Sequence, residues 1–366
     1  MVLVFSWAYA ARDLLPIQDK PGWDAPTARR APPLARYDSG WYLGIAERGY
    51  GPAPAPGEAS AHAFLPLYPA LVAAFSRFFR VDGFAAGIGV SAACFFCAGL
   101  LFAAEGRRRL TEKGALTALA LLLLFPTSFF LVSMYSESLF LLLALLSFDR
   151  LRRRQALAAV LFGFLAGLTR LAALALTLPL AIEAWRISRR PGVAARADRR
   201  AAAAAFFCGL APALGVLLWI IAAGRIAGEP GLVFRVQEAW HRGTSPLEGL
   251  ARFAAGAVSI ARGQAWQHPT FALDYAYTLL FVAIAVFQAR RGRYGDVAWT
   301  AGAILLPVAT GIAASLPRYL LVVYPAFYAL AEFFDGRPKL RVLWWALSAV
   351  LLLAGEAAFV HWRWVA

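Results

Sequence analysis

Two carboxylates and two arginines are notable because each lies in or beside an apolar or aromatic stretch. Asp38 opens the aromatic-rich string DSGWYLGIAERGY, and Glu137 lies at the entry to the apolar run in MYSESLFLLLALLSF. Arg170 is the one charge in GFLAGLTRLAALALTLPL, and Arg318 precedes YLLVVYPAFYAL. A carboxylate can take a proton from a hydroxyl, and the forked donors of arginine suit a phosphate. These residue types could therefore activate a hydroxyl and hold a phosphate.

Each of these side chains also has an ordinary structural explanation. Asp38 could cap a helix, and Glu137 could interact favourably with the dipole of the helix that it begins. Arg170 could form a structural ion pair with a carboxylate. Arg318 and Tyr319 lie at one end of an apolar run, where an aromatic residue commonly anchors a helix at the membrane surface.

Aromatic and amide side chains on neighbouring segments could bind a sugar. Trp41, Tyr42 and Ile45 share one face of a short predicted helix, and aromatics on one face favour a position along the membrane surface. Gln237 and Trp240 lie in FRVQEAWHRG, which could equally form an ordinary surface helix. The remaining candidates are Asp24, Glu47 and His62, for acceptor binding or a share in proton transfer, and His241 and Arg242 beside Trp240.

The elements that position these residues are predicted to be apolar helices. Apolar residues make up 61% of the 366 residues, only 16% are charged, and the mean hydropathy is +0.61. A soluble domain contains roughly 45–50% apolar residues, and a disordered chain needs low hydrophobicity. The composition excludes both classes and predicts an all-α polytopic membrane protein, with residues 1–366 forming one transmembrane domain.

Eleven apolar runs predict about eleven transmembrane helices. A helix needs about 20 apolar residues to cross the hydrocarbon core, and the runs 1–16, 115–127 and 156–169 are shorter than this. These three either end inside the protein or have wrongly placed boundaries. The other runs are 84–104, 129–149, 171–187, 201–223, 271–289, 297–316, 319–334 and 341–362.

The basic residues predict the orientation. The chain has 36 Lys and Arg against 21 Asp and Glu, and runs such as Arg107–Arg109 and Arg152–Arg154 lie between apolar segments. The positive-inside rule places these short loops in the cytoplasm, where they contact anionic lipid headgroups. We therefore expect membrane lipids, and no nucleic acid, as partners of the basic residues. Two long outer loops follow, 17–83 and 224–270.

The first outer loop, 17–83, is predicted to carry interfacial helices. The string DSGWYLGIAERGY forms one of them. The run AFLPLYPALVAAFSRFF is predicted to be a second interfacial or re-entrant helix, because a full span there would turn every later basic loop outward.

Several strings occur in one order over nearly the whole chain: RYDSGWYLGIAERGY, AFLPLYP, FPTSFFLVSMYSESLF, AGLTR, QEAW and PRYLLVVYPAF. This series resembles the PIG-V family, the second mannosyltransferase of GPI-anchor synthesis, together with its bacterial relatives of unassigned acceptor. Two departures are mild: Tyr37 stands where a tryptophan usually precedes the aspartate, and FLPLYP lacks a second phenylalanine that is common there. The match at Arg318 is weaker than the others.

The resemblance implies a GT-C fold with its active site on the outer face and a polyprenyl-phosphate-mannose donor. It implies that Asp38 is the catalytic base. It also places Glu137, Arg170, Gln237 and Trp240 at family motif positions whose individual roles are less settled.

We therefore expect a membrane glycosyltransferase, mannosyltransferase-like, that acts with inversion at the outer face of a bacterial inner membrane. Asp38 would take the proton of an acceptor hydroxyl that attacks the sugar C1, and Arg170, helped by Arg318, would hold the leaving phosphate. The acceptor, a glycan, glycolipid or protein, stays open. The alternative is a transporter or flippase of a polyprenyl-linked sugar, which would need the arginines and aromatics but no base; the chain has no evident repeated halves.

No cofactor or metal is expected. Phosphate is a good leaving group, and the four histidines form neither an HxxxH nor an HxH pair. Cys94 and Cys97 form a CxxC inside an apolar run, where helix packing explains them better than zinc. The whole hypothesis requires Asp38 and Arg170 to open to the same cleft.

Overall fold

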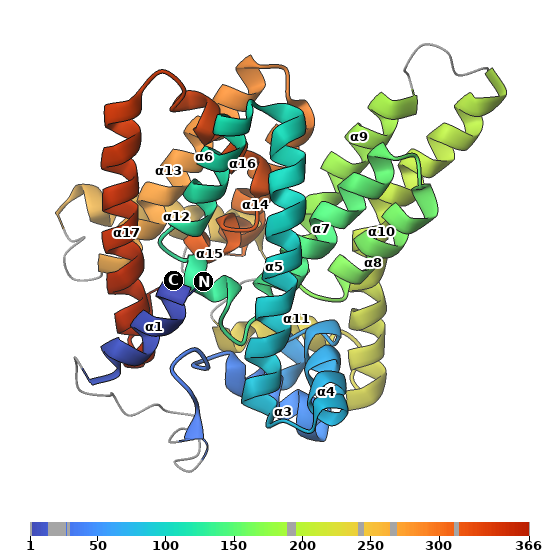
Figure 1. The fold of residues 1–366 in the computed structure, drawn as a ribbon. Coiled ribbons are helices and arrows are strands. Elements are labelled where there is room, and N and C mark those ends of the chain that lie inside the picture. Colours follow the sequence, from blue (N-terminus) through green and yellow to red (C-terminus); the bar gives the residue numbers. More distant parts are fainter. Residues whose placement is uncertain are drawn as a thin grey trace.

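The computed structural model describes residues 2–13, 27, 30–188, 195–240, 245–263, 269–310 and 315–365. All the regular elements in these residues are helices, which confirms the all-α prediction. Most of the longer helices run in broadly the same direction and form a bundle, with two short helices at one end and several loops at the other (Figure 1).

Five helical segments among the described residues are long and apolar enough to cross a membrane, which is compatible with a polytopic membrane protein. Each of the other predicted runs also contains a helix, but these helices are shorter. The five segments are α5 (Gly83–Arg109), Leu171–Ser188, which ends in α9 (Thr177–Ser188), Phe206–Ala227 within α10 (Ala195–Ala227), Ala272–Arg290 within α13 (Pro269–Arg290), and α17 (Pro338–Val360). The shorter helices are α1 (Val2–Ala10), α6 (Glu112–Leu123), α7 (Glu137–Arg152), α8 (Ala156–Gly167), α14 (Tyr294–Ala309) and α16 (Tyr324–Phe333).

The short helices are joined by turns that lie inside the protein. Residues 125–136, between α6 and α7, are all buried, and so is most of the turn around Arg170 between α8 and the 3₁₀ helix η4 (Leu171–Leu176). The segment before α16 contains the five-residue helix α15 (Leu316–Leu320), which is also largely buried. These interior turns are the reason that several helices have fewer residues than a full crossing requires.

Two predicted helices are broken rather than continuous. In the run 129–149, the 3₁₀ turn η3 (Ser128–Leu131) comes first and α7 starts only at Glu137. In the run 319–334, α15 ends at Leu320, and α16 starts at Tyr324 with a proline in its first turn. The fixed φ of proline favours helix starts. The break 321–323 is entirely apolar, and the break before α7 carries Ser133 and Ser136 among apolar residues, so hydropathy alone gives little sign of either.

The first predicted outer loop contains the predicted short helices. Helix α3 (Ser39–Arg48) covers most of the string DSGWYLGIAERGY and ends at Gly49, whose φ of +75° is one that glycine adopts without strain. Helix α4 (Leu67–Phe79) has 13 residues, too few for a full crossing. Both lie at one end of the bundle (Figure 1).

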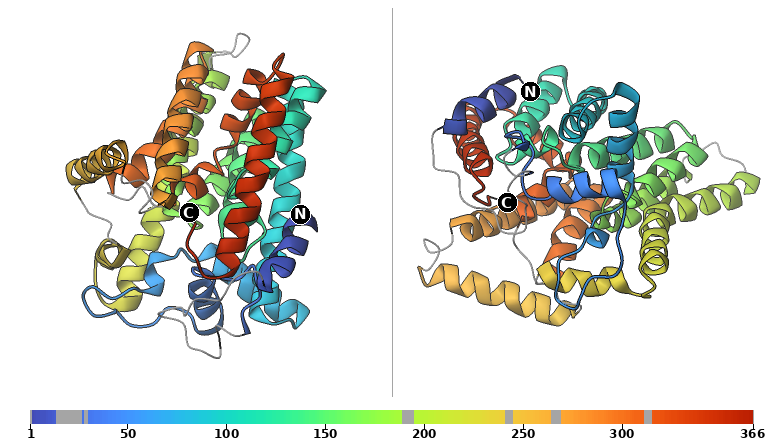
Figure 2. Two further views of the ribbon diagram at one scale, coloured as in Figure 1. Left: turned by 90° about the vertical axis from the view of Figure 1, so that its left-hand side faces the viewer. Right: turned by 90° about the horizontal axis from the view of Figure 1, so that it is seen from below.

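The second predicted outer loop is mostly helical. It contains α11 (Leu232–Val236), the 3₁₀ helix η5 (Gln237–Trp240) and α12 (Pro246–Ala261). Helix α12 lies on the outside of the bundle, at a steep angle to the long helices (Figure 2).

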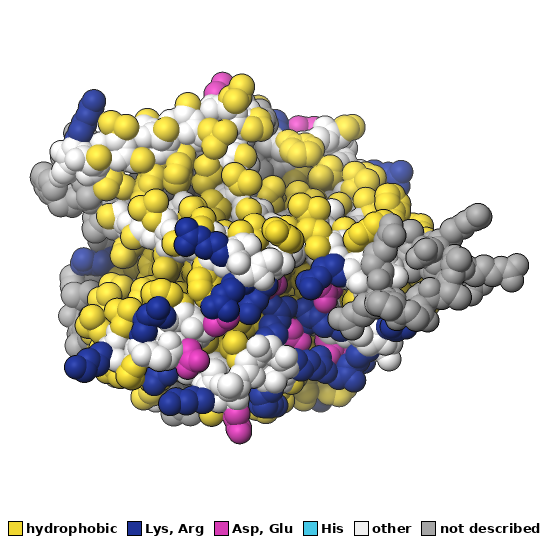
Figure 3. Space-filling view, turned by 90° about the horizontal axis from the view of Figure 1, so that it is seen from above, with side chains coloured by type: hydrophobic (Ala, Val, Ile, Leu, Met, Phe, Trp, Pro, Cys, Tyr) yellow, Lys and Arg dark blue, Asp and Glu magenta, His cyan; other side chains and the backbone are white. Residues whose placement is uncertain are grey.

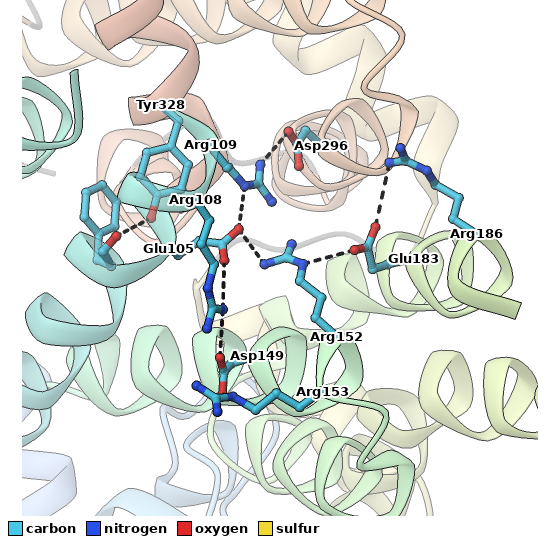
Figure 4. A network of polar contacts seen from close by, with 11 residues as sticks. Glu105, Arg108, Arg109, Asp149, Arg152, Arg153, Glu183, Arg186, Asp296 and Tyr328 are labelled. Atoms are coloured by element: carbon cyan, nitrogen blue, oxygen red, sulfur yellow. Dashed lines mark hydrogen bonds and ion pairs between the residues drawn. The ribbon is translucent and has the colours of Figure 1, made fainter. Parts of the chain in front are cut away.

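A network of ion pairs occupies the end of the bundle opposite α3 and α4 (Figure 3). Its centre is Glu105, whose carboxylate lies 2.6 Å from Arg109 and 2.5 Å from Arg152 (Figure 4). Arg109 also pairs with Asp296, and Arg152 with Glu183. The network joins α5, α7, α9 and α14, and it shows that both triple-arginine runs lie at the same end of the molecule.

Candidate functional site

Four charged side chains form a continuous chain of ion pairs at the interior turns. Arg318 Nη1 lies 2.9 Å from Asp38 Oδ2, and Arg318 Nε lies 2.8 Å from Glu137 Oε1. Arg170 also pairs with Glu137. The Glu137 side chain is completely buried and the two arginine side chains are 7–8% exposed, whereas Asp38 is 18% exposed. With two carboxylates and two guanidiniums, the group has a formal net charge of zero.

Three of these residues lie beside a helix start or in a turn, and the fourth lies in a five-residue helix. Asp38 precedes α3, Glu137 is the first residue of α7, and Arg170 has extended backbone between α8 and η4. Arg318 lies in α15. The structure thus brings together residues as far apart in sequence as 38 and 318.

Close packing of α8 against α10 sets the position of the Arg170 turn. A Cβ on Gly167 would lie 2.2 Å from the backbone oxygen of Pro212, and one on Gly215 would lie 2.2 Å from that of Phe164. Small residues allow helix backbones to approach this closely. Helix α8 ends at Gly167, within this contact and three residues before Arg170.

A buried polar segment ties α3 to the start of α7. Ser39 Oγ donates to the Met134 carbonyl at 3.1 Å, and Tyr42 and Ser136 share a hydroxyl hydrogen bond of 2.9 Å. Ser136 also accepts a hydrogen bond from Arg170 Nη1 at 3.2 Å. These bonds fix α3 relative to the arginines.

Aromatic rings surround the guanidinium groups. The Tyr319 ring lies 5.4 Å from the Arg170 guanidinium and 5.7 Å from that of Arg318. Arg318 is also 5.2 Å from the Tyr135 ring and 5.8 Å from the Trp364 ring. Rings at such distances attract a cation, so they stabilise the guanidinium groups in an apolar interior.

A cavity of about 780 Å³ opens beside the ion pairs and is lined by Asp38, Arg170 and Arg318 together. This volume is within the usual range for a small-molecule site. A second part of its lining is an aromatic group of Trp41, Phe64 and Trp240, whose ring centroids are 5.9–6.2 Å apart. The cavity therefore combines a cationic region, a carboxylate and aromatic faces.

Most of the residues selected from the sequence line this cavity, and a few do not. Glu137 lies behind the two arginines rather than in the lining. His62 is buried beside the cavity, with Nδ1 hydrogen-bonded to Ser60 Oγ at 2.8 Å, and burial lowers the pKa of this imidazole. Asp24, His241 and Arg242 lie outside the described residues. The selected residues in the lining are Asp38, Trp41, Tyr42, Glu47, Arg170, Gln237, Trp240 and Arg318.

The geometry bears on two of the structural explanations. Asp38 occupies the N-cap position of α3, but its side chain makes no capping hydrogen bond, and it pairs with Arg318 instead. Arg170 does form a structural ion pair, with Glu137, yet its side chain also lines the cavity. Ion pairing and ligand binding are therefore compatible at Arg170.

Three residues that contribute to the cavity or its hydrogen bonds were not selected from the sequence. Phe64 and Trp364 line the cavity, and Ser136 bonds to Arg170 and Tyr42. Ser136 could have been found as the neighbour of Glu137 in the YSES string. Phe64 and Trp364 carry no such signal, because apolar aromatics are common throughout the chain.

The described residues contain no group of three or more His, Cys, Asp or Glu side chains that could hold a metal ion. No family model, curated protein or solved structure matches the chain. Its function is therefore argued from the residues and their geometry.

Proposed function

We propose that this protein is a membrane glycosyltransferase that moves a sugar from a polyprenyl-phosphate donor to an acceptor hydroxyl. The observation that carries the proposal is the shared cavity, in which the Asp38 carboxylate lies beside the arginines Arg170 and Arg318. The motif resemblance to PIG-V enzymes adds mannose as the sugar and a GT-C fold, and the apolar runs of the sequence add about eleven transmembrane helices.

The two arginines would hold the donor phosphate. Arginine presents several N–H donors in a planar fork that matches phosphate oxygens. In the free protein both guanidiniums pair with Glu137, which keeps two like charges close together without a ligand. A phosphate would meet an already assembled pair of cations, and preassembled charges stabilise a developing negative charge most effectively.

Asp38 would act as the general base in a single displacement. The acceptor oxygen attacks the sugar C1, its proton passes to the Asp38 carboxylate, and the C1–O bond to the phosphate breaks with its electrons remaining on the phosphate. Attack opposite the leaving group inverts the configuration at C1. In the free protein Arg318 occupies Oδ2 of Asp38, so donor phosphate that draws Arg318 away would also release the base.

The aromatic group would bind sugar rings. Trp41, Phe64 and Trp240 present rings to the cavity from α3, the 61–67 segment and η5. Gln237 and Glu47, which also line the cavity, offer hydrogen bonds to sugar hydroxyls.

The proposed orientation follows from the basic residues. Both triple-arginine runs lie at the end opposite α3 and α4, and the positive-inside rule places that end in the cytoplasm. The α3 end would then face outward from a bacterial inner membrane.

The purified protein, reconstituted in proteoliposomes and given donor labelled in its sugar, tests the proposal. Membranes from the cells that produce the protein supply the acceptor. We expect labelled product and free polyprenyl phosphate. Arg170→Gln should raise the donor KM roughly 10- to 100-fold, since charge-assisted hydrogen bonds contribute about 1.5–3 kcal/mol each. Arg186→Gln is the matched control, because Arg186 pairs with Glu183 but is largely exposed. Movement of unchanged donor across the bilayer without product would establish a flippase instead.

A further inference from the structure

We propose that Tyr135 is a positioning residue that holds the Asp38 carboxylate in the cavity through the backbone on either side of Tyr37. Tyr135 lies in the buried turn before α7, is fully buried, and is not among the described residues that line the cavity. Its hydroxyl donates a hydrogen bond to the Arg36 carbonyl at 3.0 Å and accepts one from the Asp38 N–H at 3.3 Å. The consequence for catalysis rests on the proposed function, whereas the consequence for this backbone does not.

The segment that Tyr135 contacts contains a sharp bend. Tyr37 has a φ of +51°, in the left-handed region that a residue other than glycine occupies at a cost. Such a conformation persists only where surrounding contacts hold it. The turn is closed by the Ser39 N–H, which donates to the Arg36 carbonyl at 3.1 Å. Because the Tyr135 hydroxyl bonds to the residues immediately before and after the bend, it fixes the direction in which Asp38 leaves the turn.

Tyr135 is itself fixed by neighbouring elements. Ser91 Oγ, on α5, donates to the Tyr135 carbonyl at 3.0 Å, and it shares a second hydrogen bond of 2.8 Å with the Tyr68 hydroxyl of α4. The Met134 N–H donates to the Leu34 carbonyl at 3.0 Å. All of these residues are buried. The position of Tyr135 is therefore set by α4, α5 and the chain before the bend, and its hydroxyl transmits that position to Asp38.

Tyr135 also contacts the ion-pair partner of Asp38. Its ring centroid lies 5.2 Å from the Arg318 guanidinium, and Arg318 Nη1 lies 2.9 Å from Asp38 Oδ2. A general base has to lie within about 2.6–3.2 Å of the oxygen whose proton it takes, and a displacement of about 1 Å can lower a rate ~10²-fold. Once donor phosphate draws Arg318 away, the Tyr135 hydroxyl continues to hold the Asp38 backbone. The carboxylate therefore keeps its aim after it loses its partner.

Hydrogen exchange, resolved to the Asp38 amide by fragmentation of its peptide, tests the structural part. Tyr135→Phe removes only the hydroxyl and should raise exchange of this amide at least ~10-fold, because the N–H loses its acceptor. Tyr328→Phe is the matched control and should leave the Asp38 amide unchanged. Tyr328 is also fully buried, donates to the Phe102 carbonyl at 2.7 Å, and has its ring 5.4 Å from the Arg109 guanidinium. Unchanged exchange in Tyr135→Phe would overturn the proposal.

Transfer from labelled polyprenyl-phosphate-mannose tests the catalytic part. Tyr135→Phe should lower kcat at least ~10-fold while changing the donor KM less than about threefold, because the ring stays beside Arg318. Tyr328→Phe should change neither value. In an Asp38→Asn background, Tyr135→Phe should add less than about twofold, because both changes remove the same function. A raised KM with unchanged kcat, or full additivity, would overturn the positioning role.

Unfolding free energies separate positioning from a general loss of stability. Each tyrosine variant loses one buried hydroxyl, so the two losses of stability should be of the same order, and only Tyr135→Phe should lose transfer. An equal loss of transfer in Tyr328→Phe would overturn the positioning role. Wild-type protein without transferase activity would refute the proposed function, and exchange would still decide whether the Tyr135 hydroxyl holds the Asp38 backbone.

Discussion

Glu137→Gln removes the negative charge that lies between two buried guanidiniums. Glu137 is 0% exposed, and the side chains of Arg170 and Arg318 are only 7% and 8% exposed. Removing one partner from a buried ion pair costs about 3–5 kcal/mol, because the charge that remains is uncompensated. We expect the free energy of unfolding to fall by about this amount, since glutamine cannot neutralise either arginine.

The chain offers a matched control in Glu332, which also bridges two arginines. Its carboxylate lies 2.8 Å from both Arg291 and Arg293, but those side chains are 52% and 28% exposed. Solvent screens such pairs, and they contribute about 0–1 kcal/mol. Glu332→Gln therefore changes the same chemistry with a different degree of burial, and it should lower stability by less than about 1 kcal/mol.

Denaturant unfolding in one detergent, followed by tryptophan fluorescence, measures both variants. A second substitution, Arg170→Gln, should recover part of the loss in the Glu137→Gln background, because it restores the charge balance. Equal losses in Glu137→Gln and Glu332→Gln would refute the argument that burial makes the site sensitive to its charge balance.

Three further predictions concern other parts of the site. Burial lowers the pKa of His62 from its ordinary 6.5, so the folded state disfavours the protonated ring. The wild-type protein should therefore have its full stability advantage over His62→Gln above pH 6.5, and this advantage should shrink as the pH falls below that value. The difference in melting temperature between the two proteins measures it. Trp240→Ala should raise the KM for the sugar-bearing donor several-fold, whereas Trp185→Ala, on the exposed surface of α9, should leave it unchanged. Gly167→Ala should destabilise the fold by about 1–3 kcal/mol through the clash with α10. Gly99→Ala, in open space on α5, should be neutral or slightly stabilising. Equal unfolding free energies of the two variants would contradict the close packing.

Hydropathy predicted where the helices are, because every apolar run contains one. It could not predict the breaks before α7 and α16. The break 321–323 is as apolar as the helices beside it, and the serines in the turn before α7, such as Ser133 and Ser136, are buried among apolar residues. A turn buried in protein needs few polar residues, so the ordinary loop signal is weak there.

The candidate site was predictable in its charged members and not in their pairing. A charge in an apolar run is costly, so Arg170 and Glu137 were conspicuous from composition alone. That Glu137 would contact both arginines, and that Arg318 would reach Asp38, depends on how distant turns meet.

The central claim is that Asp38 takes the acceptor proton, and one measurement tests it most directly. Wild-type protein and Asp38→Asn are loaded with labelled polyprenyl-phosphate-mannose, and a single round of transfer is followed after acceptor is added. The account predicts that Asp38→Asn binds the donor but transfers its sugar at least ~10²-fold more slowly, as expected for loss of a general base. Transfer by Asp38→Asn at the wild-type rate would contradict the account.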